Sequence, residues 1–378
     1  MALESQLDGR HQGAFLVPRC LHALLKRQGR CVVDIDYAPS GHAFRAQMEA
    51  CGRFRPDIIV DDLSPAAYLT TRVSSKPRVA IRRTGVFPGG IPRNSAHRHS
   101  MCSPERVERF YKNCEAIWGI RPPTNLVEMC TADVNIVPGI RSVEVLPDSL
   151  HNNADYIFSG GLTLPDALVP AESPVSPAEI SAFCERNRDR KLVYLTVGSI
   201  LKGGGVEFRE MIRYMLDEGA AVISSVEMPD LSQAFREIFF YAPFLPMHHI
   251  CGKVHLMIHH CGSGTYQYAI RYQIPSICIG SRCYDRDDVA ARLEELGVAR
   301  YIPSARENPE FARTFRERFK DSVDKSGNWY QSAKEKVGVL KTENDLTAAA
   351  FDFAAVLDTA VENHHKGRAN ARLPKLVS

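Results

Sequence analysis

A short turn in the second half of the chain, HCGSGT at residues 260–265, carries glycines where a strand should meet a helix. The apolar run VHLMIH precedes it, and a segment with helical spacing follows it. Glycine lets a backbone approach a ligand closely, and the free amides and the dipole at a helix N-terminus favour negative charge. The turn therefore predicts a phosphate site. Its members are Gly262, Ser263, Gly264 and Thr265.

His260 stands at the expected end of the strand, beside this turn. It could donate a hydrogen bond to a phosphate oxygen, and a histidine satisfied within the fold is the alternative. The surrounding segment MHHICGKVHLMIHHC is rich in His and Cys and raises the question of a zinc site. Tetrahedral zinc needs spaced ligands that converge on one point. Strand alternation sends His259 and His260 to opposite faces, and no second Cys/His pair stands nearby in the sequence, so we predict no metal.

The elements that must position these residues alternate along the chain. Apolar runs that suit buried parallel strands occur in both halves, and helix-like segments separate many of them. The clearest runs are PDIIVDDL, KPRVAIRRTG, ADVNIVPG, ADYIFSGG, KLVYLTVGS, AAVISSV, VHLMIHH and PSICIG. Repeated strand–helix alternation indicates two parallel sheets covered by helices, which is an α/β fold with two Rossmann-like domains.

Proline breaks regular structure, and four prolines crowd into residues 164–180, so we place an interdomain linker there. An N-terminal domain then occupies 1–163, and a C-terminal domain occupies 181–345. A helix and a basic tail follow at 346–378, and we expect the end of this tail to be frayed.

The composition excludes several classes of protein. The chain has 378 residues, of which 44% are hydrophobic and 24% charged, and a formal net charge of +3, too small to predict nucleic-acid binding. No apolar run approaches the roughly 20 residues that cross a bilayer, and MALESQLDGRHQG lacks the apolar core of a signal peptide. The eleven cysteines include no CxxC pair, which is typical of reduced core thiols. We predict a cytoplasmic protein.

The order of motifs in the second half resembles that of the nucleotide-sugar-dependent glycosyltransferases of the GT-B fold, in particular the UDP-glycosyltransferase family. In that family a strand ends in a motif such as HxGxGT, followed by a helix, a G-(V/I)-P strand start, a DQxxNA segment and an LGVG-like turn. The corresponding segments here are HCGSGT at 260–265, QIPSICIG at 273–280, DRDDVA at 285–290 and LGVA at 296–299. Their spacing matches without gaps.

The resemblance implies two domains that face a cleft and an inverting transfer of a sugar from a UDP- or dTDP-sugar to a hydroxyl or amine. The acceptor would be a small molecule, with natural products as one class, and no metal or other cofactor is implied. In the C-terminal domain the turn, His260 and Ser199 would hold the diphosphate, Phe244 would pack near the base, and Asp285 and Arg286 would lie near the sugar. Asp62 would orient a histidine base on the N-terminal domain or cap the next helix.

Several positions depart from the family pattern. Arg286 stands in place of the glutamine of the DQ pair, and Val289 in place of the asparagine that follows it. Tyr268 replaces the glutamate that commonly holds the ribose, and Met247 replaces the glutamine of a PQ pair. Alignment on Pro18 puts Phe15 where the catalytic histidine belongs, so the first strand is absent or replaced. His11 lies four residues earlier and fills the role of base only if the loop is rearranged; an exposed loop residue is the alternative.

Several alternatives stay open. A basic stretch in the first half could receive an anionic acceptor or be a solvated surface loop; its members are Arg82, Arg83, Arg93, His97, Arg98 and His99. The same fold also carries nucleotide-sugar epimerases and hydrolases, and a non-catalytic member would bind a nucleotide or a partner protein. The sequence does not choose between a monomer and a homodimer.

Overall fold

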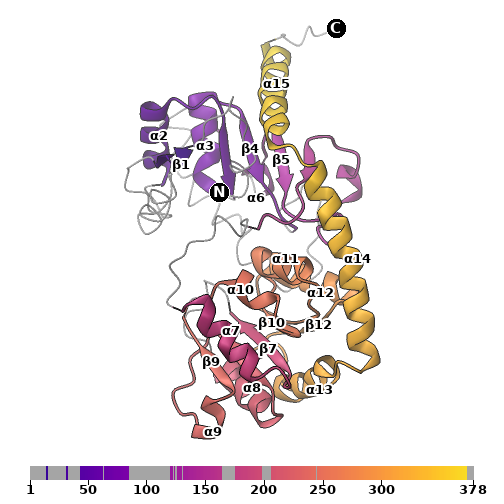
Figure 1. The fold of residues 1–378 in the computed structure, drawn as a ribbon. Coiled ribbons are helices and arrows are strands. Elements are labelled where there is room, and N and C mark those ends of the chain that lie inside the picture. The colour runs from indigo at the N-terminus through magenta and orange to yellow at the C-terminus, as the bar shows by residue number, and fades with distance from the viewer. Residues whose placement is uncertain are drawn as a thin grey trace.

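Two parallel sheets lie one above the other in the computed structural model, and a long helix runs along the side of both (Figure 1). The structure describes most of the chain. The described ranges are 14–15, 31–32, 43–62, 64–84, 120–121, 123, 126–129, 131–163, 175–197, 206–243 and 245–372. Described elements of the first half form the upper layer of Figure 1, and those of residues 175–323 form the lower one.

The C-terminal sheet is fully parallel, with the strand order β12-β11-β10-β7-β8-β9. Its strands are β7 (Leu192–Thr196), β8 (Ala221–Ser224), β9 (Phe239–Tyr241), β10 (Leu256–His259), β11 (Ser276–Ile279) and β12 (Ala299–Ile302). Every residue of β7, β8, β10 and β11 is buried, which explains why these strands are continuous apolar runs in the sequence. Since β7 neighbours both β8 and β10, the strand order reverses between β7 and β10.

Helices accompany this sheet, and all of them except the short α9 bury apolar side chains. They are α7 (Pro177–Arg186), α8 (Val206–Asp217), α9 (Gln233–Arg236), α10 (Met247–Cys251), α11 (Ser263–Arg271), α12 (Tyr284–Glu295) and α13 (Phe311–Val323). In α8 the buried residues Phe208, Met211, Ile212 and Met215 recur at helical spacing. A capping box between Ser176 and Glu179 begins α7, so the last residues of the predicted linker belong to a helix.

The N-terminal sheet has the parallel order β3-β4-β5-β6. Its strands are β3 (Ile59–Asp62), β4 (Arg78–Ile81), β5 (Val134–Val137) and β6 (Tyr156–Phe158), accompanied by α2 (Ala43–Phe54), α3 (Pro65–Ser74), α6 (Leu126–Met129) and the short helix η4 (Asp148–Leu150). A separate parallel pair joins β1 (Ala14–Phe15) to β2 (Cys31–Val32). A short strand therefore does precede Pro18, and it ends at the residue that aligns with the family's histidine.

The chain returns to the N-terminal domain at its end. After α14 (Asn328–Ala350), α15 (Phe353–Arg372) packs Phe353, Val356 and Leu357 against Val79 and Ile136 of the N-terminal sheet. Asn363 donates hydrogen bonds to the Asp133 carbonyl and to Asp155 Oδ1 at 3.1 and 2.9 Å. The predicted frayed tail is helical up to Arg372, as the continuation of a helix whose earlier residues Phe353, Val356, Leu357 and Ala360 cover the first sheet.

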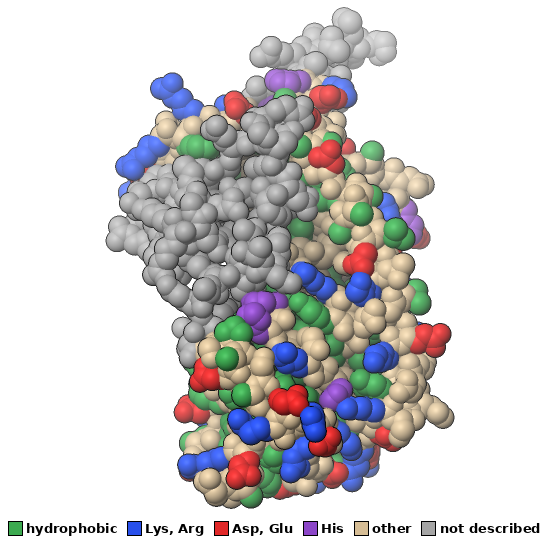
Figure 2. Space-filling model, in the orientation of Figure 1, with side chains coloured by type: hydrophobic (Ala, Val, Ile, Leu, Met, Phe, Trp, Pro, Cys, Tyr) green, Lys and Arg blue, Asp and Glu red, His purple; other side chains and the backbone are tan. Residues whose placement is uncertain are grey.

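Acidic and basic side chains are interspersed on the face of the C-terminal domain that Figure 2 shows. Several pair locally, as Arg318 does with Glu294 at 2.8 Å. Exposed pairs of this kind contribute little to stability, so the buried apolar clusters hold the fold. Among the described helices, none has the length and apolar character that crossing a membrane requires.

Candidate functional site

The predicted phosphate-binding turn lies at the switch point of the C-terminal sheet. His259, the last residue of β10, pairs in register with Thr196, the last residue of β7. His260 and the turn follow immediately. In doubly wound sheets, ligands bind outside the carboxyl ends of the strands where the strand order reverses. The sheet topology thus places the turn where a ligand is expected.

The turn opens α11, with Gly262 as the residue before the helix. The amide of Thr265 donates to the Gly262 carbonyl at 2.8 Å, so it is already used within the first helical turn. Within the described residues, the amides of Gly262, Ser263 and Gly264 have no such partner. A side chain added at Gly264 would meet no described atom within 4 Å. Three amides, and not the Thr265 amide that we predicted, are therefore available to an anion here.

His260 is buried beside these amides, with 4% of its surface exposed. Burial, followed by the nearby positive charge of Arg286, lowers its pKa to about 4, although the Thr196 backbone and Asp285 act in the opposite direction. The ring is therefore neutral at neutral pH. Its Nδ1 is buried and has no hydrogen-bond partner among the described residues. A buried polar atom of this kind is available to a ligand.

The start of α12 completes this group of side chains. Asp285 and Arg286 lie in its first turn, close enough to His260 to change its pKa. Asp285 Oδ1 also accepts a hydrogen bond from the Cys283 thiol at 2.8 Å. The structure thus brings together three residues that the sequence analysis assigned to the donor, from two different loops.

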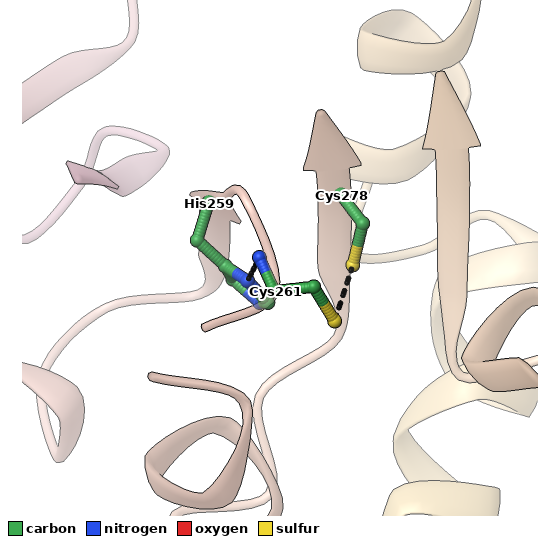
Figure 3. A group of neighbouring side chains, drawn as sticks. All are labelled: His259, Cys261 and Cys278. Carbon is green, nitrogen blue, oxygen red and sulfur yellow. Dashed lines mark hydrogen bonds between the residues drawn. The ribbon is translucent and has the colours of Figure 1, made fainter. Parts of the chain in front are cut away.

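A second group, His259, Cys261 and Cys278, lies directly behind the turn (Figure 3). All three side chains are at most 2% exposed, and the two sulfurs are 3.9 Å apart. Their potential ligand atoms lie within 4.8 Å of one another. However, His259 Nδ1 accepts a hydrogen bond from the Cys261 amide at 3.0 Å, which occupies the lone pair that a metal would need. The sequence analysis missed this convergence because Cys278 comes from the neighbouring strand.

In the N-terminal domain, Asp62 accepts hydrogen bonds from Arg83 Nη2 at 3.1 and 2.9 Å and is about half exposed. The turn before α3 is held by its neighbour Asp61, which accepts from the Ser64 amide at 3.0 Å and pairs with Arg78 at 2.7 Å. Among the described contacts, Asp61 and not Asp62 bonds the start of α3, through the amide of its N-cap residue Ser64. Asp62 stands at the carboxyl end of β3 with a cation as its partner.

Arg82, predicted within a basic surface stretch or an acceptor loop, is buried at 1% exposure and bonds Asn135 through Nε at 3.0 Å. Burial is the main cause that lowers its pKa to about 9. Other predicted residues lie outside the described residues. These are His11, Ser199, Phe244, Arg93, His97, Arg98 and His99.

A buried carboxylate that the sequence analysis did not single out joins the two domains. Glu144 accepts hydrogen bonds from the amide and hydroxyl of Thr84, at 2.9 and 2.5 Å, and from the Tyr266 hydroxyl at 2.6 Å. Burial raises its pKa, and the bonds from Thr84 and Tyr266 oppose that rise. Thr84 follows β4, and Tyr266 lies in α11. The only sequence signal is an acid within the apolar stretch IRSVEVL.

The loop that carries Glu144 packs into the other domain. Ile140 and Val143 belong to an apolar cluster whose other members come from the C-terminal domain. Gln267 of α11 donates to the Pro138 carbonyl at 3.0 Å, and Arg292 of α12 donates to the Ser142 carbonyl at 2.7 Å. Because these segments follow the carboxyl ends of β5, β10 and β11, those edges of the two sheets face each other.

Replacing Tyr266 with phenylalanine should lower the thermal midpoint by a few degrees. The change leaves Glu144 buried with one donor fewer, which costs about 2 kcal/mol for a bond to a charged group. Differential scanning calorimetry measures the effect. Tyr241→Phe, on an exposed side chain of β9, is the matched control and should leave the midpoint nearly unchanged. Equal midpoints for the two variants would show that the bridge does not hold the domains together.

No protein-family model matches the chain. Among curated proteins, it is 24% identical over 130 residues to 10-deoxymethynolide desosaminyltransferase of Streptomyces venezuelae, covering 33% of this chain and 30% of the relative. It is 24% identical over 125 residues to aclacinomycin-T 2-deoxy-L-fucose transferase of Streptomyces galilaeus, covering 30% and 27%. Each alignment thus spans less than a third of the relative.

Solved structures match over nearly the whole chain. The calicheamicin glycosyltransferase CalG4 has a TM-score of 0.65 at 18% identity, covering 97% of this chain and 94% of that one. The glycosyltransferase VinC, solved in complex with dTDP, has a TM-score of 0.57 at 16% identity, covering 91% and 90%. Os79 from O. sativa, solved in complex with UDP, has a TM-score of 0.60 at 14% identity, covering 86% and 82%. The chain therefore has the two-domain GT-B fold of the nucleotide-sugar-dependent glycosyltransferases.

Proposed function

We propose that the protein is an inverting, metal-independent glycosyltransferase that moves a sugar from a UDP- or dTDP-sugar to a hydroxyl or amine of a small acceptor. The observation that carries the proposal is the group at the switch point of the C-terminal sheet. The amides of residues 262–264 and Nδ1 of His260 lie there beside the start of α12 with Arg286. None of these amides, nor Nδ1, has a hydrogen-bond partner among the described residues. Such a group suits a diphosphate.

The likeness to known proteins supports the same chemistry. The curated relatives are named as transferases of desosamine and of 2-deoxy-L-fucose, and solved structures of the same fold hold dTDP or UDP. Both curated relatives come from Streptomyces, and each name also contains a second compound, 10-deoxymethynolide or aclacinomycin-T. We infer that the acceptor here is a small natural product.

In the proposed reaction, the acceptor oxygen or nitrogen attacks the anomeric carbon while the bond from that carbon to the diphosphate breaks. Negative charge then grows on the leaving diphosphate, where the α11 amides and Arg286 would stabilise it without a metal ion. The proton of the acceptor would pass to a base on the N-terminal domain. Asp62 lies at the carboxyl end of β3, and His11 is the histidine that it would orient.

The direct test is nucleotide binding by isothermal titration calorimetry with UDP, dTDP and GDP. We expect selective binding of a pyrimidine nucleoside diphosphate in buffer that contains EDTA, because the site would neutralise the diphosphate with amides and Arg286. Transfer to candidate acceptors is then followed by mass spectrometry with the matching sugar nucleotide. Absence of binding by every nucleotide would refute the proposed donor site.

A second candidate is a non-catalytic member that binds a nucleotide. The observation in its favour is Tyr268, which stands where the family has the ribose-binding acid and stacks on Tyr272 at 6.2 Å between ring centroids. With a tyrosine at this position, the site lacks the carboxylate that would bind the ribose hydroxyls. Long incubation distinguishes the candidates: a bound sugar nucleotide that stays intact with every acceptor favours the non-catalytic one. Consumption of donor without acceptor indicates a hydrolase or an epimerase.

A further inference from the structure

The residue that turns the chain from β10 into α11 has an uncommon backbone conformation. Cys261 has a φ of 57°, in the left-handed region that glycine adopts freely and that a side chain with a Cβ rarely adopts. Gly262 returns to a φ of −60°, and the helix begins at Ser263. The direction of the amides at 262–264 thus depends on one strained residue. Strained residues persist only where the surroundings hold them.

His259 stabilises the left-handed conformation of Cys261. Its Nδ1 accepts the hydrogen bond from the Cys261 amide at 3.0 Å, while the Cys261 thiol packs against the Cys278 thiol at 3.9 Å (Figure 3). The backbone of His259 is fixed by the sheet, because His259 pairs with Thr196 on one side and with Cys278 on the other, and its ring is buried. Both the backbone and the side chain of Cys261 are therefore fixed from β10 and β11.

The protonation state of His259 is consistent with its role as the hydrogen-bond acceptor for the Cys261 amide. A neutral imidazole that accepts at Nδ1 carries its proton on Nε2. In the part of the chain that the structure describes, the buried Nε2 of His259 has no hydrogen-bond partner. A buried N–H without a partner destabilises the fold. An apolar side chain would fill the same space without that cost, so the contribution specific to the histidine is the Nδ1 acceptor. Burial keeps the ring neutral, with a pKa of about 3.

We propose that His259 is a positioning residue. Through the Cys261 amide it holds the left-handed turn that aims the amides of residues 262–264 at the diphosphate. It touches neither donor nor acceptor. That the amides bind a diphosphate rests on the proposed function. The hydrogen bond from Cys261 to His259 and the strained turn are present without a ligand.

Four variants separate the hydrogen bond from packing. His259→Leu removes the acceptor, and His259→Asn keeps an oxygen near the place of Nδ1. Cys261→Gly makes the left-handed conformation free of strain, so a double variant with His259→Leu should no longer need the histidine. We expect His259→Leu to weaken UDP or dTDP binding by about tenfold and His259→Asn by about twofold or less. The double variant should bind within about twofold of Cys261→Gly alone.

The chain offers a matched control in His255, at the other end of β10. Its Nδ1 accepts a hydrogen bond from the Leu192 amide at 3.0 Å, far along the strand from the turn. His255→Leu removes the same kind of bond and should leave nucleotide affinity unchanged. Equal losses of affinity in His259→Leu and His259→Asn, or no rescue by Cys261→Gly, would show that packing alone explains His259.

Residue-resolved hydrogen exchange tests the hydrogen bond from the Cys261 amide to His259 in the absence of any ligand. The Cys261 amide should exchange slowly in the wild type and in His259→Asn, and faster in His259→Leu. If the wild type binds no nucleoside diphosphate, the proposed donor site fails, and this exchange pattern still supports the hold on the turn. Rapid exchange of the Cys261 amide in the wild type would overturn it.

Discussion

The variant His260→Ala should lower kcat/KM for sugar transfer by about a hundredfold. Nδ1 of His260 is the buried ring nitrogen that has no partner among the described residues, and it lies beside the α11 amides. Since the Thr196 backbone accepts from the ring, Nδ1 can donate to the diphosphate only after the ring takes up a proton, which the charge of the bound diphosphate favours. A hydrogen bond to a charged group stabilises by about 1.5–3 kcal/mol, and loss of a donor to growing negative charge costs about 10²–10³ in rate. The loss should therefore appear in transfer and, to a smaller degree, in affinity for UDP or dTDP.

Steady-state kinetics with saturating acceptor, together with calorimetry of nucleotide binding, measures this effect. His260→Asn places an amide nitrogen near Nδ1 and should retain more activity than His260→Gln, whose amide reaches further. The control is His365→Ala, an exposed histidine of α15 that lies on the N-terminal domain. Turnover equal to that of the wild type in His260→Ala would remove His260 from the donor site.

Four strands of the C-terminal sheet were predictable because they are buried on both faces, whereas the partly exposed β9 and β12 were not predicted. A strand without a solvent face is a continuous apolar run, and the runs that contain β7, β8, β10 and β11 read that way. The position of α15 was not predictable. Its apolar residues indicate a buried helix face. No local pattern identifies the surface on which it packs, because the N-terminal sheet ends almost two hundred residues earlier in the sequence.

The residues of the candidate site likewise include some that the sequence predicts and some that it does not. The turn at 260–265 could be predicted because strand, glycines and helix are adjacent in the sequence. Glu144 could not, because its partners Thr84 and Tyr266 lie far away in the chain. Asp61 and Asp62 show a finer limit. Strand alternation predicts that the two side chains point to opposite faces of the sheet. Only the ion pair with the buried Arg78 shows that Asp61 points inward.

Acid should destabilise the protein already below about pH 6.5, because two buried histidines take up protons less readily in the folded state than in the unfolded chain. The pKa of His259 is lowered to about 3, and that of His260 to about 4, in both cases chiefly by burial. In the unfolded chain both rings titrate near 6.5. Below that pH the unfolded state binds more protons than the folded state, so stability is complete above about pH 6.5 and falls as the pH decreases.

At pH 4 the loss is roughly 3 kcal/mol from each of these rings, which is a large part of the 5–15 kcal/mol that holds a typical domain. Urea unfolding followed by circular dichroism from pH 7 to pH 4 measures it. His259→Asn removes one titrating group, so its stability should fall less steeply, by about 1.4 kcal/mol per pH unit between pH 6 and pH 4. The comparison isolates the histidine because all other titrating groups are common to both proteins. Identical pH dependence in the wild type and in His259→Asn would mean that this ring becomes protonated without unfolding, and that its burial does not hold it neutral.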